Sequence, residues 1–191
     1  MSLAETKDGY LEGQLLIAMP AMADRRLART LIYLCAHSPD GAMGLVVNKL
    51  MVSITFPELL TQLGIVPPKS KADIRVHFGG PVEPGRGFVL HSRDYLQEGT
   101  LEITDNIALT ATIDILKEIA VGGGPKRNLL ALGYVGWGPG QLESQIQDNA
   151  WLNVDPSDGL LFDPDLDTKW KRAMQKLGID FSMLSGKAGR A

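Results

Sequence analysis

Glycine and proline are the residues that most constrain the fold of this chain, because they are gathered into short clusters. The 191 residues include 21 glycines and 11 prolines. Glycine permits positive φ and proline fixes φ near about −65°, so both interrupt regular backbone. Short elements joined by sharp turns are therefore predicted, without a linker, a fixed-period repeat or an internal domain boundary. The clusters span residues 79–81, 84–87, 122–125 and 133–140.

The composition is typical of a globular protein with one core. Apolar residues make up 45% of the chain and charged residues 21%. A compact chain of this length buries roughly 70% of its unfolded surface and needs no disulfide or metal to hold it together. A single domain over residues 1–191 is predicted, with residues 1–10 and 185–191 expected to be flexible.

Charge, cysteine content and hydropathy restrict the location and the partners. The net charge of −3 opposes a general nucleic-acid surface, and the basic group Arg25, Arg26 and Arg29 is not followed by a basic recognition helix. A single cysteine, Cys35, leaves no internal disulfide and favours a reducing compartment. No apolar run approaches the ~20 residues of a membrane helix, and the first residues do not resemble a signal peptide. We expect a cytoplasmic protein that contacts neither a membrane nor nucleic acid directly.

Hydrophobic periodicity predicts interleaved strands and helices. In the strand over residues 30–37, the side chains of Leu31, Tyr33, Cys35 and His37 are expected to share one face. Turn residues at 38–41 predict a hairpin over residues 30–48, and the strands at 75–78 and 87–91 are expected to pair. Because hairpins require antiparallel pairing, the fold class is a mixed α+β. Strands are predicted at 14–18, 30–37, 43–48, 75–78, 87–91, 100–104, 128–135, 150–154 and 159–162. Helices are predicted at 56–63, from 110 or 112 to 120, from 138–139 onward, and from 163–164 to 177.

Cysteine and histidine are the candidate catalytic residues. Cys35 lies within an apolar strand, where burial raises the pKa of a thiol and hides it, so a core position is favoured over a nucleophile. His37, His77 and His91 each lie near a predicted strand end, and none belongs to a common metal-binding motif. The acidic stretch over residues 155–167 lacks the spacing of a calcium loop. No metal or cofactor is expected.

Two glycine-rich turns are the most unusual segments. The turn at residues 79–87 could form a nest of backbone N–H groups for an anion, with Arg86 adding charge, or it could be a tight connection only. The segment over residues 133–143 feeds a strand into a helix N-terminus. There Trp137 offers an apolar wall, and Gln141 and Glu143 offer polar contacts. Alternatively, the glycines allow close packing and Trp137 fills the core.

The chain resembles the bacterial YqgE/AlgH family over nearly its whole length, from about residue 11 to 184. The resemblance implies an α+β fold in which a mixed, largely antiparallel split sheet curls into a pseudo-barrel with surrounding helices. The family has no established biochemical activity, and some members carry the label of transcriptional regulator without a DNA-binding motif. Leu50 replaces the proline usual after Asn-Lys, and Arg190 stands where the tail usually has histidine. The matching segments are LEGQLLIAMPAM, RTLIYLCAHSPDGAMGLVVNK, HFGGPVEPGRGFVLHS and LGYVGWGPGQLESQIQDNAWL.

Two functional hypotheses follow. The first is a non-enzymatic binding or regulatory protein that acts on an unknown protein or small-molecule ligand. Its site joins irregular segments that face each other across a shared hollow. The second is a small-pocket enzyme, such as a hydrolase, with His37 or His91 as the base and Cys35 or Glu143 as its partner. The ligand-binding residues of the first hypothesis are Asn48, Gly79, Gly80, Pro81, Trp137, Gln141 and Glu143.

Overall fold

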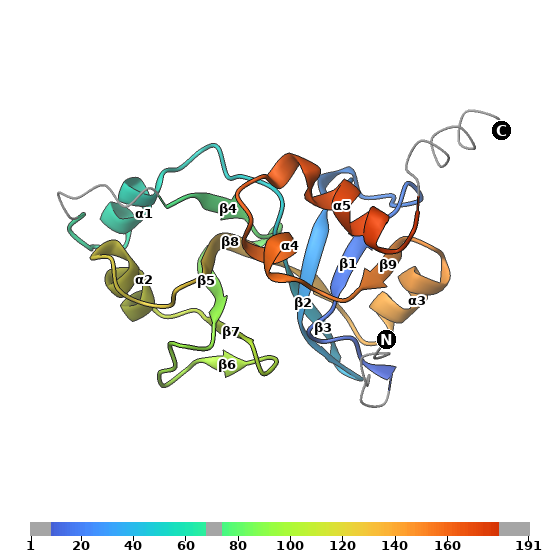
Figure 1. Ribbon diagram of the computed structural model, residues 1–191, viewed down its shortest axis with the longest axis horizontal. Helices are drawn as coiled ribbons and strands as arrows, with labels where there is room; N and C mark the ends of the chain where they lie inside the picture. The colour runs from blue at the N-terminus through green and yellow to red at the C-terminus, as the bar shows by residue number, and fades with distance from the viewer. Residues whose placement is uncertain (1–8, 68–73, 180–191) are drawn as a thin grey trace.

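The computed structural model describes residues 9–67 and 74–179, so the segments expected to be flexible lie outside the described residues except for positions 9 and 10. Nine strands form one curled sheet in the order β6-β7-β5-β8-β3-β2-β1-β9, with β4 also paired to β8 (Figure 1). The strands are β1 (Leu15–Ala18), β2 (Leu31–Ser38), β3 (Gly41–Val46), β4 (Val76–Phe78), β5 (Val82–Ser92), β6 (Leu101–Glu102), β7 (Ile107–Thr110), β8 (Asn128–Trp137) and β9 (Trp151–Val154). The α-helices are α1 (Phe56–Gln62), α2 (Ile113–Ala120), α3 (Gln141–Gln147), α4 (Asp158–Phe162) and α5 (Lys169–Lys176), and the 3-10 turns are η2 (Arg25–Leu27) and η3 (Leu166–Thr168).

The structure confirms the expected α+β class and the mixed, largely antiparallel curled sheet. The only parallel pair among the described strands joins β4 to β8. Along β8, the first half pairs with β5 and β4 and the second half pairs with β3. This one long strand therefore links the two halves of the curled sheet.

Three apolar clusters hold the helices on the sheet. Helices α4 and α5 pack on the central cluster through Leu160, Leu161 and Trp170. Helices α1 and α2 pack at one end of the molecule, and α3 packs at the other, around Leu142 (Figure 1). Residues of β8 occur in all three clusters. Gly133 has a φ of +76° and lies between residues 129–132, which pack in the central and α1–α2 clusters, and Val135 and Trp137, which pack in the α3 cluster.

Several predicted elements differ from the structure. Residues 159–162 belong to helix α4 rather than to a strand, because Ser157 caps the helix by accepting the Leu160 N–H at 3.3 Å. Strands β4 and β5 do not pair with each other; they lie on opposite sides of β8. Strand β7 is absent from the prediction. Helix α3 begins at Gln141, after a left-handed Gly140, and not at residues 138–139.

An irregularity in β2 separates Cys35 from His37. The pairing with β3 shifts between Leu34 and Ala36, which makes Cys35 an extra residue of a β-bulge. An extra residue reverses the alternation of side chains beyond it. Cys35 lies in the central cluster, while His37 contacts the 10–11 segment and α3, so the expected common face is wrong for His37.

Within the described residues no helix is both long and apolar enough to cross a membrane.

Candidate functional site

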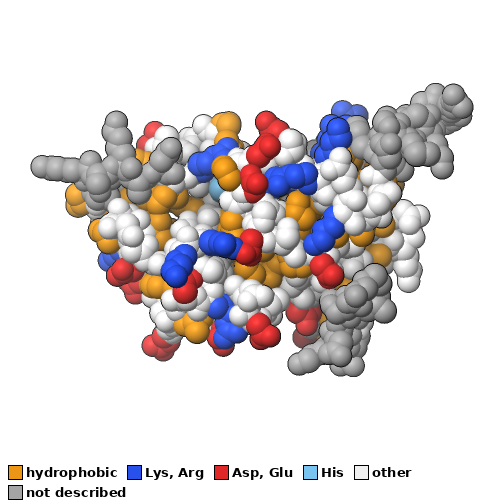
Figure 2. All heavy atoms as spheres, in the orientation of Figure 1, with side chains coloured by type: hydrophobic (Ala, Val, Ile, Leu, Met, Phe, Trp, Pro, Cys, Tyr) orange, Lys and Arg blue, Asp and Glu red, His pale blue; other side chains and the backbone are white. Residues whose placement is uncertain are grey.

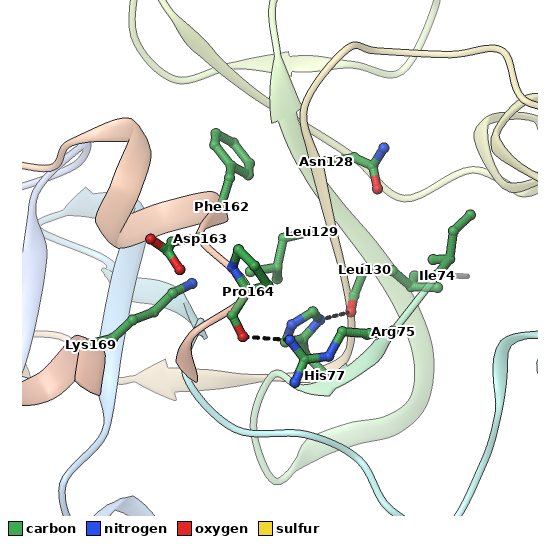
Figure 3. A pocket seen from close by; sticks show the side chains of 10 residues that line it. All are labelled: Ile74, Arg75, His77, Asn128, Leu129, Leu130, Phe162, Asp163, Pro164 and Lys169. Atoms are coloured by element: carbon green, nitrogen blue, oxygen red, sulfur yellow. Dashed lines mark hydrogen bonds between the residues drawn. The ribbon is translucent and has the colours of Figure 1, made fainter. Parts of the chain in front are cut away.

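Two adjoining pockets lie between the sheet and the segment that leads from α4 into α5. The inner pocket has a volume of about 170 Å³ and is lined by His77, Asn128 and Lys169 among others. The outer pocket has a volume of about 630 Å³ and extends toward Lys49. Arg75 and Pro164 line both pockets. The Nη1 atom of Arg75 donates a hydrogen bond of 2.6 Å to the Pro164 carbonyl oxygen (Figure 3).

His77 is placed in the inner pocket by the parallel pairing of β4 with β8. Its Nδ1–H donates to the Leu130 carbonyl oxygen at 2.9 Å. Burial, together with the nearby Lys169 and Arg75 charges, lowers the pKa of His77 to about 4, against the Leu130 hydrogen bond, which raises it. The imidazole is therefore neutral near pH 7. Since Nδ1 carries the proton, Nε2 has a lone pair that can accept a hydrogen bond.

Lys169 is the most unusual residue of the inner pocket. It is fully buried at the start of α5. Its Nζ donates to the carbonyl oxygens of Val47 at 3.2 Å and Leu161 at 2.9 Å. Burial lowers the pKa of Lys169 to about 8, although the Asp163 carboxylate opposes that shift. A buried lysine with a lowered pKa beside a pocket is a typical feature of functional sites.

The segment from α4 to α5 is held by its own ion pair. The Asp163 carboxylate accepts the Asp165 N–H at 2.7 Å and pairs with Arg172 at 3.3 Å. The Asp165 hydrogen bond and the nearby cations hold the pKa of Asp163 below its usual range. Pro164, the acceptor for Arg75, is thereby fixed between two anchored residues.

The outer pocket carries an excess of positive charge although the chain as a whole is negative. Four cations line it, against two carboxylates. The side chains of Lys49 and Lys171 form no ion pair or hydrogen bond with another residue of the described ranges. Figure 2 shows basic and acidic side chains gathered on this face over α4 and α5. The cations are Arg29, Lys49, Arg75 and Lys171, and the carboxylates are Asp165 and Asp167.

Asn48 is the sequence-predicted site residue that lines the outer pocket. Its Oδ1 accepts the Leu31 N–H at 2.9 Å, and its Nδ2 donates to the Arg29 carbonyl oxygen at 3.0 Å. Arg29 has a φ of +54°, which is uncommon for a residue other than glycine. Its guanidinium lies 5.3 Å from the centroid of the Trp170 ring. Asn48 therefore fixes the backbone from which Arg29 reaches this pocket.

The structure does not bring Asn48 together with the Trp137 turn. Asn48 lies just beyond the end of β3, whereas Trp137 pairs with Ala42 near the start of that strand. Six residues of strand separate the two positions by about 20 Å. Gly79 and Gly80 lie between them and cross β8: the Gly79 N–H donates to Leu132 at 2.8 Å, and its carbonyl oxygen accepts from Val46 at 2.8 Å. Pro81 follows at the start of β5.

The residues of the Trp137 turn contact one another and α3. The buried Trp137 Nε1–H donates to Gln145 Oε1 at 2.9 Å, and Gln145 also accepts from Trp151 at 2.9 Å. Gln141 Oε1 accepts the Gly138 N–H at 2.8 Å. Trp137 also lines an open groove of about 570 Å³ on the sheet, apart from Asn48, together with Arg86. In this turn the hydrogen bonds join β8, α3 and β9.

The candidate catalytic residues are already engaged. Burial raises the pKa of the Cys35 thiol, which donates to the Tyr33 carbonyl oxygen at 3.6 Å. His37 Nδ1 accepts the Leu11 N–H at 3.0 Å, and its Nε2 contacts the Glu143 carboxylate. The two predicted partners His37 and Glu143 are thus together, but neither ring nitrogen is left to act as a base.

His91 is likewise engaged at both nitrogens. Its Nδ1 donates to the Ser92 carbonyl oxygen at 2.8 Å, and its Nε2 lies 2.7 Å from Thr110 Oγ1. Burial lowers the pKa of His91. Among the described residues, no group of three or more His, Cys, Asp or Glu could hold a metal ion.

Sequence reasoning missed Arg75 and Lys169 and gave His77 no role in the site. The signal for Lys169 was its spacing, three residues after Leu166 and four before Ala173, which places a lysine on the buried stripe of a helix. Nothing local marked Arg75, because its relation to Pro164 depends on the packing of α4 against β8.

The curled sheet, its long connecting strand and the helices on both faces define a small α+β protein of half-barrel type. An AlgH-like family model matches residues 15–182. The chain is 56% identical to a UPF0301 protein of Afipia carboxidovorans, over 95% of this chain and 90% of that protein. It is 51% identical to one of Rhodospirillum rubrum, over 100% of this chain and 99% of the relative. The chain belongs to the AlgH-like family, as its motifs predicted.

Solved structures agree with this assignment. The AlgH protein of Pseudomonas aeruginosa superposes with a TM-score of 0.80 at 41% identity, over 92% of this chain and 93% of that one. A Corynebacterium diphtheriae protein superposes with a TM-score of 0.70 at 18% identity, over 86% and 85% of the two chains, and shows that the fold extends to distant sequences.

Proposed function

We propose that the protein is a non-enzymatic binding protein that takes a small anionic ligand in the outer pocket. We place it in the cytoplasm, with a regulatory role exerted through the ligand rather than through direct contact with nucleic acid. The observation that carries the proposal is the excess of cations around a pocket of about 630 Å³ in a chain of net charge −3.

Electrostatics and geometry both support an anion. Lys49 and Lys171 line the pocket without a carboxylate partner among the described residues. Arg75 presents a planar guanidinium, which suits carboxylate and phosphate groups. Asn48 hydrogen-bonds the backbone of Arg29, and the Pro164 carbonyl oxygen hydrogen-bonds the guanidinium of Arg75. An anion would therefore meet cationic groups that are already positioned.

Two lysine pairs test the proposal. The K49Q/K171Q variant removes two cations from the pocket, and the control K117Q/K126Q removes two exposed lysines elsewhere. Titration calorimetry and thermal shift would use inorganic phosphate, succinate, citrate and adenosine monophosphate as probes. We expect at least one probe to bind, and the pocket variant to weaken it at least about 10-fold, or about 1.4 kcal/mol. The control should bind as the wild type does.

Two outcomes would contradict the proposal. One is that no anionic probe binds even at low ionic strength, where charge interactions are strongest. The other is that both lysine variants weaken binding equally, since the effect would then come from the net charge and not from the pocket.

A further inference from the structure

We propose that Lys169 forms a Schiff base with a small 2-oxo acid whose carboxylate pairs with Arg75. This inference rests on the proposed function, because Arg75 lines both pockets, and it names the class of ligand that reaches the inner one. The ligand would place its carboxylate at the boundary between the pockets and its carbonyl carbon against the Lys169 amine.

The hydrogen bonds of Lys169 orient its amine. A neutral amine has two N–H groups, and two carbonyl oxygens, of Val47 and Leu161, accept from this one. The fourth tetrahedral direction then holds the lone pair. Lys169 lines the inner pocket, and Figure 3 shows its side chain extending from α5 toward Pro164. The arrangement resembles that of an amine prepared for addition to a carbonyl.

The inner pocket suits a very small ligand. Its volume of about 170 Å³ is well below that of the outer pocket, about 630 Å³. Leu129 and Phe162 supply apolar walls, and Arg75 supplies a cation for a carboxylate. Asp163 also lines this pocket, but Arg172 and the Asp165 N–H already engage its carboxylate. A compound with a carboxylate next to a carbonyl matches the combination of the Arg75 cation, the Lys169 amine and limited space.

The inner pocket is partly open to solvent, and Arg75 at its edge is exposed. Lys169 itself is fully buried, so a ligand reaches its amine only when the side chains that cover it move; the exposed Arg75–Pro164 hydrogen bond lies where the two pockets adjoin. A ligand carboxylate can replace the Pro164 carbonyl oxygen as the acceptor for Arg75. The same contact would then hold the acid beside Lys169.

The reaction is balanced without an oxidant or cofactor. The Lys169 ammonium first loses a proton to water, and the Nζ lone pair attacks the carbonyl carbon. The carbonyl oxygen takes up two protons and leaves as water, and a C=N bond forms; the net change converts one ammonium and one carbonyl into one protonated imine and one water. Burial lowers the pKa of Lys169 to about 8, so roughly a tenth of the amine is neutral at pH 7.

Reductive trapping tests the inference on the full chain. The protein would be incubated with pyruvate and sodium cyanoborohydride, and the adduct located by intact-mass and peptide mass spectrometry. We expect one reduced pyruvate per chain, on Lys169. The K169R variant should carry none, R75M should carry at least about 10-fold less, and the exposed-lysine control K126R should match the wild type. Acetone, which lacks the carboxylate, should label Lys169 far less than pyruvate does.

The outcome separates this inference from the proposed function. If phosphate or succinate binds the outer pocket but Lys169 stays unlabelled, the Schiff base is excluded and the anion site remains. Labelling spread evenly over the exposed lysines also overturns the inference. Because the label is mapped on wild-type protein, the result does not depend on whether a Lys169 variant folds. If neither trapping nor anion binding is observed, both proposals fail.

Discussion

At the residue scale, buried polar side chains shape the pockets by fixing backbone. Asn48 joins Leu31 to the left-handed Arg29, and Lys169 joins the end of β3 to the end of α4. Each such group satisfies carbonyl or N–H groups that would otherwise be buried without partners. The residues around the outer pocket therefore depend on a few hydrogen bonds whose removal can be measured.

Replacing Asn48 with alanine should destabilise the protein by about 2–3 kcal/mol. The change removes two hydrogen bonds and leaves the Leu31 N–H buried without an acceptor. Urea unfolding followed by circular dichroism measures the loss. The control N106A alters an exposed side chain and should stay within about 0.5 kcal/mol of the wild type. Equal losses in the two variants would show that the Asn48 contacts contribute nothing.

His77 should make the stability fall as the pH drops from 6.5 toward 4. Its pKa is about 4 in the folded protein, below the ordinary value of 6.5. In this window the unfolded chain takes up the proton first, so stability present above pH 6.5 is lost on acidification, by on the order of 3 kcal/mol.

The variant H77N retains an N–H donor near the Nδ1 position without the titration. Urea unfolding at pH 7, 5.5 and 4.5 should show a flatter pH dependence for H77N than for the wild type. His91 should also contribute to the loss of stability at low pH, because burial lowers its pKa too. Parallel curves for the two proteins would refute the assignment to His77.

At the element scale, the crossing of residues 79–81 over β8 joins the two halves of the sheet. A Cβ added to Gly80 would lie 2.1 Å from the Tyr134 carbonyl carbon, and one added to Gly79 would lie 2.3 Å from the Gly133 oxygen. These contacts are with backbone, which cannot move away without disturbing β8. Both positions therefore require glycine, because any side chain there would clash with the backbone of β8.

G80A should therefore lose more than about 4 kcal/mol or fail to fold. The matched variant G85A adds a methyl group where nothing lies within 4 Å, and it should fold normally. Expression level and thermal melting compare the two. A G80A protein that melts within a few degrees of G85A would mean that the crossing is not close-packed in solution.

At the scale of the whole molecule, β8 connects three apolar clusters and makes them interdependent. Trp137, Trp151 and Trp170 belong to the clusters around α3 and α5, whereas α1 and α2 pack on the third. Fluorescence therefore reports on one part of the molecule, and circular dichroism reports on all of it.

We expect one cooperative unfolding transition, with tryptophan fluorescence and far-ultraviolet circular dichroism giving the same urea midpoint. The physical reason is that loss of β8 removes packing from every cluster at once. Non-coincident curves, with fluorescence changing apart from ellipticity, would indicate that the α1–α2 end unfolds separately and that residues 1–191 do not act as a single domain.

The sequence by itself determined most of the local elements, though not α4 or β7, and the family. Periodicity predicts the β2–β3 hairpin, α1 and the central position of β8, because a strand buried on both faces needs apolar residues at nearly every position. Turn and cap residues act within a few positions of one another, so they can be read along the chain. The long motifs identified the AlgH-like family because their order and spacing are specific.

Only the tertiary structure decided which residues meet. The bulge at Cys35 turns His37 away from the thiol, and the length of β3 separates Asn48 from Trp137. The meeting of Arg75 with Pro164, and of Lys169 with Val47, joins positions 89 and 122 residues apart. Such contacts arise from how helices pack on a curled sheet, and hydrophobic periodicity specifies which face is buried but not which residues of another element cover it.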